Sequence, residues 1–329
     1  MKLTSGATLP ENRGNEVVLT LSDRIRGGFW GLLVGDAVGV PYEFHRADRI
    51  PPYDEIDMVP PVGYNRTYPE LKPGTWSDDG AQALCLLDSL LAHGTLDMRD
   101  FADRMVAWEE TGLWAVDGYV FDCGIQTMAA LQKLREGVSP TRSGFVKPEG
   151  KGNGALMRVL PLALWHQGGD AELIENAHLQ SVVTHGHVTN QVCSALYCVW
   201  ARRLMEGMDT EAAYEHAVTT LREHYGSDSE YREFLEQDVG PDEGPVTDGS
   251  GYVVATLHAA RLALRESTYE GVVKKAIQFG EDTDTNAAVA GGLAGVRSGI
   301  EGIPERWLHL MRGRELAEPL LEKLVEQRS

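Results

Sequence analysis

Residues 22–39 read S-D-R-I-R-G-G-F-W-G-L-L-V-G-D-A-V-G, and this stretch carries the strongest indication of the fold. Its apolar residues recur at helical spacing and predict a helix with Ser22 as the N-cap. Glycines follow one another at every fourth position: Gly27, Gly31, Gly35 and Gly39. Each glycine inside a helix costs about 1 kcal/mol relative to alanine. A stripe of four glycines therefore predicts that another segment of backbone lies close to this face.

A second segment repeats this spacing near the other end of the chain. Residues 287–296 are wholly Ala, Gly, Val and Leu, which predicts a buried helix. Its stripe consists of Ala287, Gly291, Gly295 and Gly299. Helical periodicity also dominates elsewhere, whereas strand-like alternation is nearly absent. The predicted helices span 22–39, 80–93, 98–111, 122–136, 153–168, 170–180, 189–207, 210–225, 251–266, 269–279, 285–298 and 314–327. One all-α domain is the simplest interpretation.

The connections do not divide the chain into separate domains. Residues 40–75 contain seven prolines and predict a long irregular connection, of a kind that is often functional. Residues 137–152 and 226–250 are predicted as surface loops, because helices of the same character resume after them. We expect a flexible leader over residues 1–21 and one all-α domain over residues 22–329.

Composition excludes several classes of function. The 329 residues include 30 Lys and Arg against 49 Asp and Glu, a net charge of −19. Binding of duplex nucleic acid is not expected, because phosphate binding needs clustered basic side chains.

The four cysteines show no zinc-like spacing and are expected to be buried free thiols. The chain starts without a signal-peptide pattern and lacks the ~18 apolar residues of a membrane span. We therefore expect a cytoplasmic protein without membrane contact; no pattern indicates its oligomeric state.

Acidic residues gather at the starts of two predicted helices. Residues 74–80 read G-T-W-S-D-D-G and residues 280–286 read G-E-D-T-D-T-N. Taken alone, the first stretch suits either helix capping or metal binding. The second stretch favours a metal, because aspartates that open a buried helix need a compensating cation. Hard divalent cations such as Mg²⁺ or Mn²⁺ prefer these ligands, and four carboxylates leave room for two ions. The candidate ligands are Ser77, Asp78, Asp79, Asp282, Asp284 and Thr285.

Further motifs complete an ordered series along residues 22–312. The series consists of Gly35-Asp36-Ala37, Pro41-Tyr42-Glu43-Phe44, Trp76-Ser77-Asp78-Asp79, Asp122-Cys123-Gly124, Gly152-Asn153-Gly154-Ala155-Leu156-Met157-Arg158, Thr184-His185 and Asp282-Thr283-Asp284-Thr285. Each motif is weak alone, but the ordered set resembles the ADP-ribosylglycohydrolases, related to dinitrogenase-reductase-activating glycohydrolase. The resemblance implies a compact, single-domain orthogonal multi-helix bundle with a binuclear Mg²⁺ or Mn²⁺ centre at an ADP-ribose cleft. The six candidate ligands above match the family's metal-binding positions.

The resemblance also implies roles for residues outside the metal ligands. Glu43 and Asp122 match carboxylates that assist hydrolysis. The positions that match the lining of the ADP-ribose site are Gly152, Asn153, Gly154, Ala155 and His185. The turn at 152–154 would present backbone N–H groups to a diphosphate at a helix N-terminus. Arg158 is assigned either to a phosphate or to a salt bridge inside the bundle.

The implied activity is hydrolysis of the bond between ADP-ribose and a protein side chain, releasing ADP-ribose. Arginine is the first choice of linkage and serine the second. Two alternatives are an ADP-ribose-binding protein with weak turnover and a two-metal nucleotide phosphohydrolase. The chain departs from the family pattern at Ser77 and Gly80, where threonine is usual, and at Glu281, where glycine is usual. These departures bear on linkage specificity, metal choice and the entrance to the cleft.

Overall fold

A computed structural model describes residues 19–329, and nearly all of their regular structure is helical. This confirms the predicted all-α domain. Residues 1–18 lie outside the described residues, and most of the predicted leader over 1–21 falls on them. The first helix starts one residue earlier than predicted, because Thr20 and not Ser22 is its cap. The Thr20 hydroxyl accepts from the backbone N–H of Asp23 at 3.1 Å, while the Asp23 carboxylate accepts from that of Thr20 at 2.9 Å.

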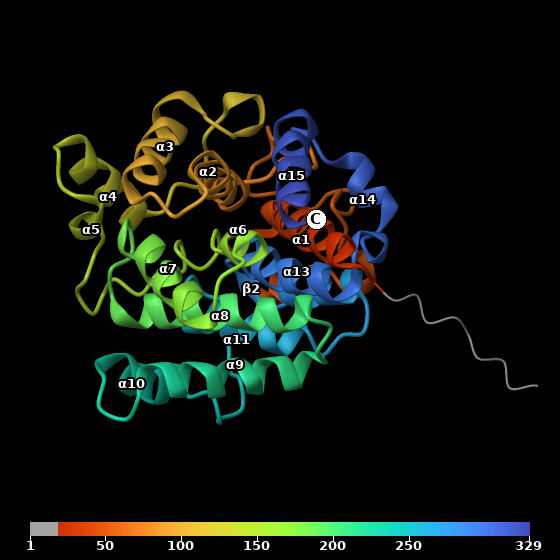
Figure 1. Ribbon diagram of the computed structural model, residues 1–329. Coiled ribbons are helices and arrows are strands. Elements are labelled where there is room, and N and C mark those ends of the chain that lie inside the picture. Colours follow the sequence, from red (N-terminus) through yellow and green to blue (C-terminus); the bar gives the residue numbers. More distant parts are fainter. Residues whose placement is uncertain (1–18) are drawn as a thin grey trace, which may run out of the picture.

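Helices follow one another along the whole described chain (Figure 1). The α-helices are α1 (Leu21–Gly39), α2 (Asp78–His93), α3 (Met98–Thr111), α4 (Ile125–Arg135), α5 (Pro140–Ser143), α6 (Leu160–Trp165), α7 (Asp170–Val182), α8 (Val188–Met205), α9 (Thr210–Tyr225), α10 (Glu230–Phe234), α11 (Val253–Ala263), α12 (Tyr269–Ile277), α13 (Thr283–Ser298), α14 (Glu305–Leu310) and α15 (Arg314–Arg328). Single-turn elements are η1 (Val40–Tyr42), η2 (Ala47–Arg49), η3 (Tyr53–Glu55), η4 (Val116–Gly118), the π-helix η5 (Leu235–Val239) and η6 (Ile300–Gly302).

The two glycine stripes meet each other at the centre of the molecule, where Figure 1 shows α1 beside α13. A Cβ atom added to Gly31 would lie 2.5 Å from the carbonyl oxygen of Gly291, and one added to Gly291 would lie 2.6 Å from that of Gly31. This confirms the predicted close approach of another backbone. The two helices run antiparallel, since the Thr283 hydroxyl at the start of α13 donates to the carbonyl of Gly39 at 2.8 Å. The end of α1 therefore lies beside the acidic start of α13.

A short strand pair, which was not predicted from the sequence, lies between the segments that follow α1 and precede α13. Strand β1 (His45–Arg46) pairs antiparallel with β2 (Gly280–Glu281). The backbone N–H of Phe44 extends the pairing and donates to the carbonyl of Glu281 at 2.6 Å. Two-residue strands carry too little alternation to be recognised in a sequence.

Three of the predicted segments are wrong in part, one of them the loop predicted over 137–152, which contains α5; α14 was not predicted at all. The helix predicted over 153–168 exists only as α6, and residues 153–159 form turns. Pro161 is the reason, because a proline without an N–H is accommodated only in the first turn of a helix. The loop predicted over 226–250 contains α10 and η5. Ser229 caps α10 by accepting from the N–H of Arg232 at 3.1 Å, and Arg222 pairs with Glu236 of η5 at 2.7 Å.

The remaining sequence expectations on burial are largely met. The cysteines are free thiols; Cys85, Cys193 and Cys198 are buried, whereas Cys123 is half-buried. Over residues 19–329, no helix combines the length and the apolar character that a membrane crossing requires.

Candidate functional site

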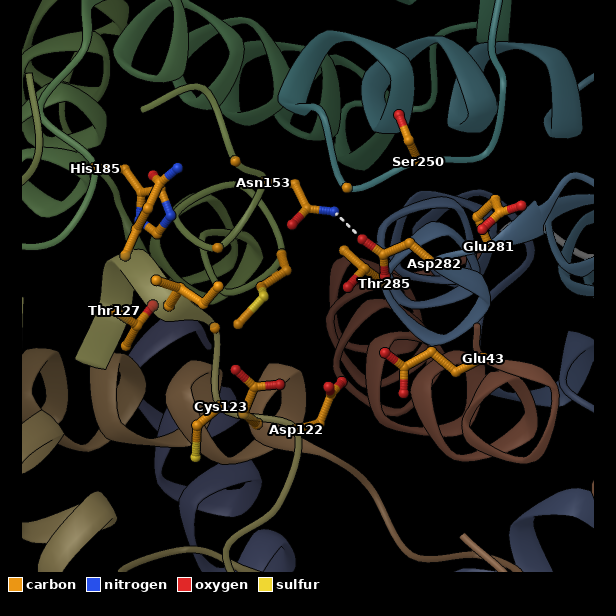
Figure 2. A pocket seen from close by; sticks show the side chains of 18 of the residues that line it. Glu43, Asp122, Cys123, Thr127, Asn153, His185, Ser250, Glu281, Asp282 and Thr285 are labelled. Carbon is orange, nitrogen blue, oxygen red and sulfur yellow. Dashed lines mark hydrogen bonds between the residues drawn. The ribbon is translucent and has the colours of Figure 1, made fainter. Parts of the chain in front are cut away.

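A cleft of ≈ 500 Å³ collects most of the residues that the sequence singles out (Figure 2). Predicted site residues in its lining are Glu43, Asp78, Asp122, Gly152, Asn153, Gly154, His185, Asp282 and Thr285. The other four, Ser77, Asp79, Ala155 and Asp284, are buried behind the lining. Residues about 200 positions apart in the sequence thus share one cleft, because α13 packs against α1.

The start of α2 is capped without help from Asp78 or Asp79. Both carboxylate oxygens of the buried Asp36 accept from the backbone N–H of Ser77, at 2.9 and 3.0 Å. One of them also accepts from the N–H of Gly80 at 2.9 Å. The Ser77 hydroxyl accepts from the N–H of Asp79 at 3.2 Å. Capping therefore accounts for Asp36 and Ser77 but leaves the paired aspartates of α2 unexplained.

The start of α13 differs from that of α2, because its N-cap residue makes no side-chain cap. Asp282 occupies the N-cap position, yet its side chain makes no capping hydrogen bond. Its carboxylate instead accepts from the side-chain amide of Asn153 at 2.8 Å. The Thr285 hydroxyl donates to the Asp79 carboxylate at 3.3 Å and so links the two helix starts. Asn153 of the predicted substrate loop thus holds an acidic side chain of the cleft.

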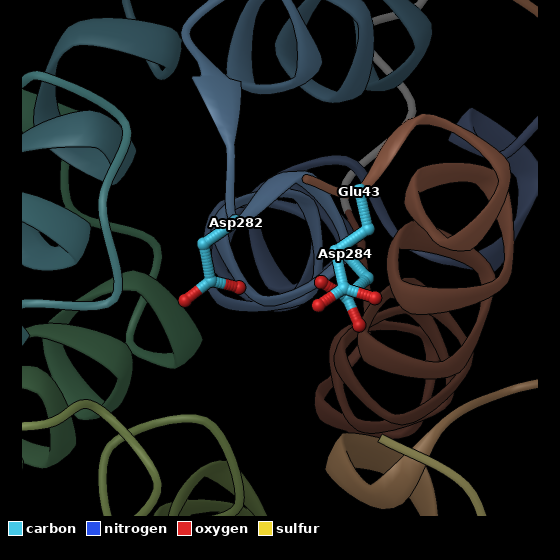
Figure 3. Close-up of side chains that lie close together, drawn as sticks. All are labelled: Glu43, Asp282 and Asp284. Carbon is cyan, nitrogen blue, oxygen red and sulfur yellow. The ribbon is translucent and has the colours of Figure 1, made fainter. Parts of the chain in front are cut away.

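Three carboxylates form the tightest acidic group among the described residues. Oxygens of Glu43, Asp282 and Asp284 all lie within 4.8 Å of one another (Figure 3). Glu43 follows η1 directly, so it reaches this group from the end of α1. The resemblance described above implies a role for Glu43 in hydrolysis near the metals and does not include it among the ligands. The geometry makes it a neighbour of both aspartates of α13.

Several carboxylate oxygens at the site are buried without any hydrogen-bond donor from residues 19–329. They are Glu43 Oε2, Asp79 Oδ2 and both side-chain oxygens of Asp284. Burial raises the pKa of Glu43 to about 11, with repulsion from Asp122 and Asp282 adding to the effect. Burial likewise raises the pKa of Asp79 and of Asp284 well above the usual range.

Such a donor set fits hard divalent cations. Buried carboxylates without donors are costly unless an opposite charge compensates them. Carboxylate and hydroxyl oxygens are the ligands that Mg²⁺ and Mn²⁺ prefer. A bound cation would also reverse the rise in carboxylate pKa. The residues that could hold one or two ions are Ser77, Asp78, Asp79, Asp282, Asp284 and Thr285, with Glu43 alongside.

A series of buried side chains linked by hydrogen bonds positions the Asp78 carboxylate. The Gln82 side-chain amide donates to the Asp78 carboxylate at 2.8 Å, and the Arg158 guanidinium donates to Gln82 at 3.1 Å. Arg158 also donates to the side chain and backbone carbonyl of Gln180, at 3.2 and 3.0 Å. Burial lowers the pKa of Arg158 to about 9. Arg158 is fully buried and does not line the cleft, which gives no support to a phosphate contact. The predicted salt bridge inside the bundle is not found among residues 19–329, where Arg158 forms these hydrogen bonds instead.

The glycine-rich loop packs directly against His185. A Cβ atom added to Gly154 would lie 2.6 Å from Cε1 of the His185 ring. Burial lowers the pKa of His185 to about 3, with the positive charge of Arg158 adding to the effect. The imidazole is therefore neutral at neutral pH. The loop does not lie at a helix N-terminus as predicted, since α6 begins only at Leu160.

Asp122 adopts a strained backbone conformation at the cleft wall. Its φ is 54°, in the left-handed region that costs a residue with a side chain about 1–3 kcal/mol. Non-glycine residues with positive φ are Phe44, Trp114, Asp117, Asp122 and Glu281. Three of these line the cleft, and the other two lie in the loop leading to Asp122. Strain of this kind concentrates at functional sites.

Sequence reasoning missed the supporting residues Asp36 and Gln82. Asp36 appears in a recognised motif, but its partner Ser77 lies 41 residues away and no local pattern connects them. Gln82 lies four residues after Asp78, so helical spacing alone could have identified that contact.

Comparisons with known proteins show the family of the chain. The sequence profile of the ADP-ribosylglycohydrolase family matches residues 18–329. The chain is 31% identical over 309 residues to the ADP-ribosylarginine hydrolase Tri1 of Pseudomonas putida (strain GB-1), covering 93% of this chain and 78% of that protein. It is 31% identical over 291 residues to the ADP-ribosyl-[dinitrogen reductase] glycohydrolase of Rhodospirillum rubrum, covering 88% of this chain and 90% of that protein.

Structural similarity extends over the same length. A solved structure described as an ADP-ribosylglycohydrolase-related protein complex superposes with a TM-score of 0.74 at 31% identity. The superposition covers 94% of this chain and 99% of that one. The resemblance inferred from the motifs is confirmed, and the chain belongs to the ADP-ribosylglycohydrolase family.

Proposed function

We propose that this protein is a Mg²⁺- or Mn²⁺-dependent hydrolase that cleaves the glycosidic bond between ADP-ribose and a protein arginine. The observation that carries the proposal is the meeting of two acidic helix starts at one cleft. One buried carboxylate oxygen of Asp79 and both of Asp284 have no hydrogen-bond donor from residues 19–329, which suits a cation site. Membership of the family and the name of the arginine hydrolase among its relatives support the same substrate class.

The cleft residues supply the remaining parts of a glycosidase. Cleavage at the ribose C1″ passes through an oxocarbenium-like state, which nearby carboxylates stabilise. When bound, the cations would orient the ribose hydroxyls and increase the acidity of water. Glu43 and Asp122 line the cleft and are the candidates for taking a proton from water and giving one to the leaving group. Gly152, Gly154 and the neutral His185 form the wall on which the rest of ADP-ribose would lie.

Arginine is favoured over serine as the linked residue because of the charge of the cleft. Besides the candidate ligands, its lining near them includes Glu43 and Asp122, and no lysine or arginine of the described residues lines it. A guanidinium leaving group is cationic, and an acidic wall attracts it more strongly than a neutral serine hydroxyl.

The test is a substrate panel with two peptides of identical sequence, one ADP-ribosylated on arginine and one on serine. Each is incubated with the protein and Mg²⁺ or Mn²⁺, and the products are separated by chromatography. We expect free ADP-ribose, released faster from the arginine peptide, and no release in excess chelator. As a matched control, the exposed Asp54 lies outside the cleft, so Asp54→Asn should keep wild-type turnover.

The other outcomes contradict the proposal in distinguishable ways. Tight binding of ADP-ribose without turnover would indicate a binding protein. Inorganic phosphate or AMP as the product would indicate a two-metal phosphohydrolase. Faster release from the serine peptide would refute the linkage preference alone.

A further inference from the structure

Two residues that line the cleft, Phe44 just before β1 and Glu281 within β2, are called the lip below. Their backbones are joined by the 2.6 Å hydrogen bond from the N–H of Phe44 to the carbonyl of Glu281. Both residues line the cleft. Figure 2 shows Glu281 on the side of Asp282 opposite to Asn153, away from the loop assigned to ADP-ribose.

Both lip residues have a positive backbone φ, which is strained for residues with a side chain. The φ of Phe44 is 59° and that of Glu281 is 58°. Glycine would adopt these angles without strain, whereas a bulky side chain at positive φ is a genuine outlier. The strain persists next to a strand pair only two residues long, so the pairing offers little in return. Strained residues of this kind point to a function of their side chains.

The side chains of the lip are available to a partner. Phe44 is 66% exposed and Glu281 is half-buried, while Ile125, another residue of the cleft lining, is 88% exposed. Among residues 19–329, neither basic residue of β1 forms an ion pair with Glu281, although His45 lies opposite it in the strand register. Arg46 pairs with Asp48 at 3.6 Å, and His45 directs Nδ1 to the backbone carbonyl of Glu43 at 2.8 Å.

The charge of Glu281 decides which partner suits the lip. ADP-ribose carries an anionic diphosphate, so a carboxylate at the edge would repel the nucleotide. A second copy of this acidic chain would bring like charges together, and nucleic acid would be repelled as well. A polypeptide with a basic and an apolar side chain near its modified arginine complements both Glu281 and Phe44.

We propose that the lip is a docking surface for the polypeptide that carries the ADP-ribosylated arginine. Glu281 pairs with a basic residue flanking the modified arginine, and Phe44 with Ile125 covers a neighbouring apolar side chain. This inference rests on the proposed function, because it assumes that a modified protein enters the cleft. It assigns Glu281 to substrate choice and not to the metal ligands.

The test compares three substrates that differ only outside the ADP-ribosyl-arginine. They are end-blocked ADP-ribosyl-arginine, a peptide with Lys and Leu flanking it, and the same peptide with Gln and Gly. Wild type is compared with Glu281→Gln, Phe44→Ala and the control Glu301→Gln, which changes an exposed carboxylate outside the cleft. We expect Glu281→Gln to lower kcat/KM for the Lys–Leu peptide about fivefold through a higher KM, as the loss of an exposed charge pair would.

The same variants should leave the single-residue substrate within about twofold of wild type, and Glu281→Gln should abolish the preference for Lys over Gln. Equal losses on all three substrates, or no loss on any, would overturn the inference. Glu281→Gly serves as a second variant, since it relieves the positive φ and should not lower the melting temperature while losing the same preference.

Failure of the proposed function is separated by the wild-type reaction on the single-residue substrate. If ADP-ribose is not released there, the proposed activity is wrong. The fluorescence anisotropy of labelled ADP-ribosylated peptides then measures their binding to the protein without turnover. Weaker binding of the Lys–Leu peptide by Glu281→Gln would still support the lip, and unchanged binding would refute it.

Discussion

Replacing Gly31 with alanine tests how the α1–α13 contact creates the site. On helix propensity alone, alanine should stabilise α1 by about 1 kcal/mol. The structure predicts the opposite sign. The added Cβ would lie 2.5 Å from the Gly291 carbonyl oxygen, whereas real Cβ atoms essentially never come closer than 3.0 Å. The three nearest atoms, which belong to Gly291 and Gly295, are all backbone atoms, so the helices themselves must move apart.

The expected cost follows from overpacking. Extra methyl groups in a well-packed core destabilise by about 1–3 kcal/mol, and here the alanine gain is lost as well. Because the start of α13 lies beside the end of α1, the shift should also displace Asp284 relative to Glu43. We therefore expect a lower free energy of unfolding in urea and weaker Mn²⁺ binding by calorimetry.

Gly169→Ala provides the matched control, since nothing lies within 4 Å of its added Cβ and its φ is negative. It should change the free energy of unfolding by less than about 1 kcal/mol and leave Mn²⁺ binding unchanged. Unchanged or higher stability of Gly31→Ala would refute the tight backbone contact as the organiser of the fold.

Three further predictions concern the acidic centre. Asp78→Asn and Asp282→Asn should each abolish turnover and weaken Mn²⁺ binding while the helical circular dichroism spectrum survives; wild-type turnover in either would remove that residue from the site. Gln82→Leu removes the donor that fixes Asp78 and should weaken Mn²⁺ binding by about 10–100-fold, as measured by calorimetry; unchanged affinity would show that the amide does not position the ligand. In chelator, the protein should lose stability as pH rises from about 4 to 7, because burial raises the pKa of Asp36 from 3.8 to about 7 and the folded state then binds more protons than the unfolded one. By linkage, this shift in the pKa of Asp36 corresponds to a loss of about 4 kcal/mol in the free energy of unfolding. Adding Mg²⁺ should counteract the loss in urea titrations. A free energy of unfolding that rises with pH over that interval would contradict the prediction.

Patterns confined to one segment could be interpreted from the sequence. The four-residue glycine stripes predicted a close backbone contact, and the structure places Gly31 against Gly291. The acidic helix starts were also recognisable, because caps and carboxylates follow one another within a few residues. The bounds of α3 and α9 agree with the predicted ranges for the same reason.

Features that depend on distant partners could not be predicted. Asp36 caps a helix that begins 42 residues later, and the two-residue strands exist only because Phe44 and Glu281 meet in space. The late start of α6 could have been predicted, because a helix that contains Pro161 has to begin just before that residue. Not every residue of a matched motif lines the cleft. Gly152 and Gly154 do, whereas Ala155 of the same motif is buried.

The most direct measurement is the rate of ADP-ribose release from an ADP-ribosyl-arginine peptide as Mg²⁺ or Mn²⁺ is titrated back into chelated protein. We expect no release without a divalent cation, a saturable rise on addition, and no recovery in Asp282→Asn. Release that is equally fast in chelator and in metal would contradict a cation-dependent centre built on the two acidic helix starts.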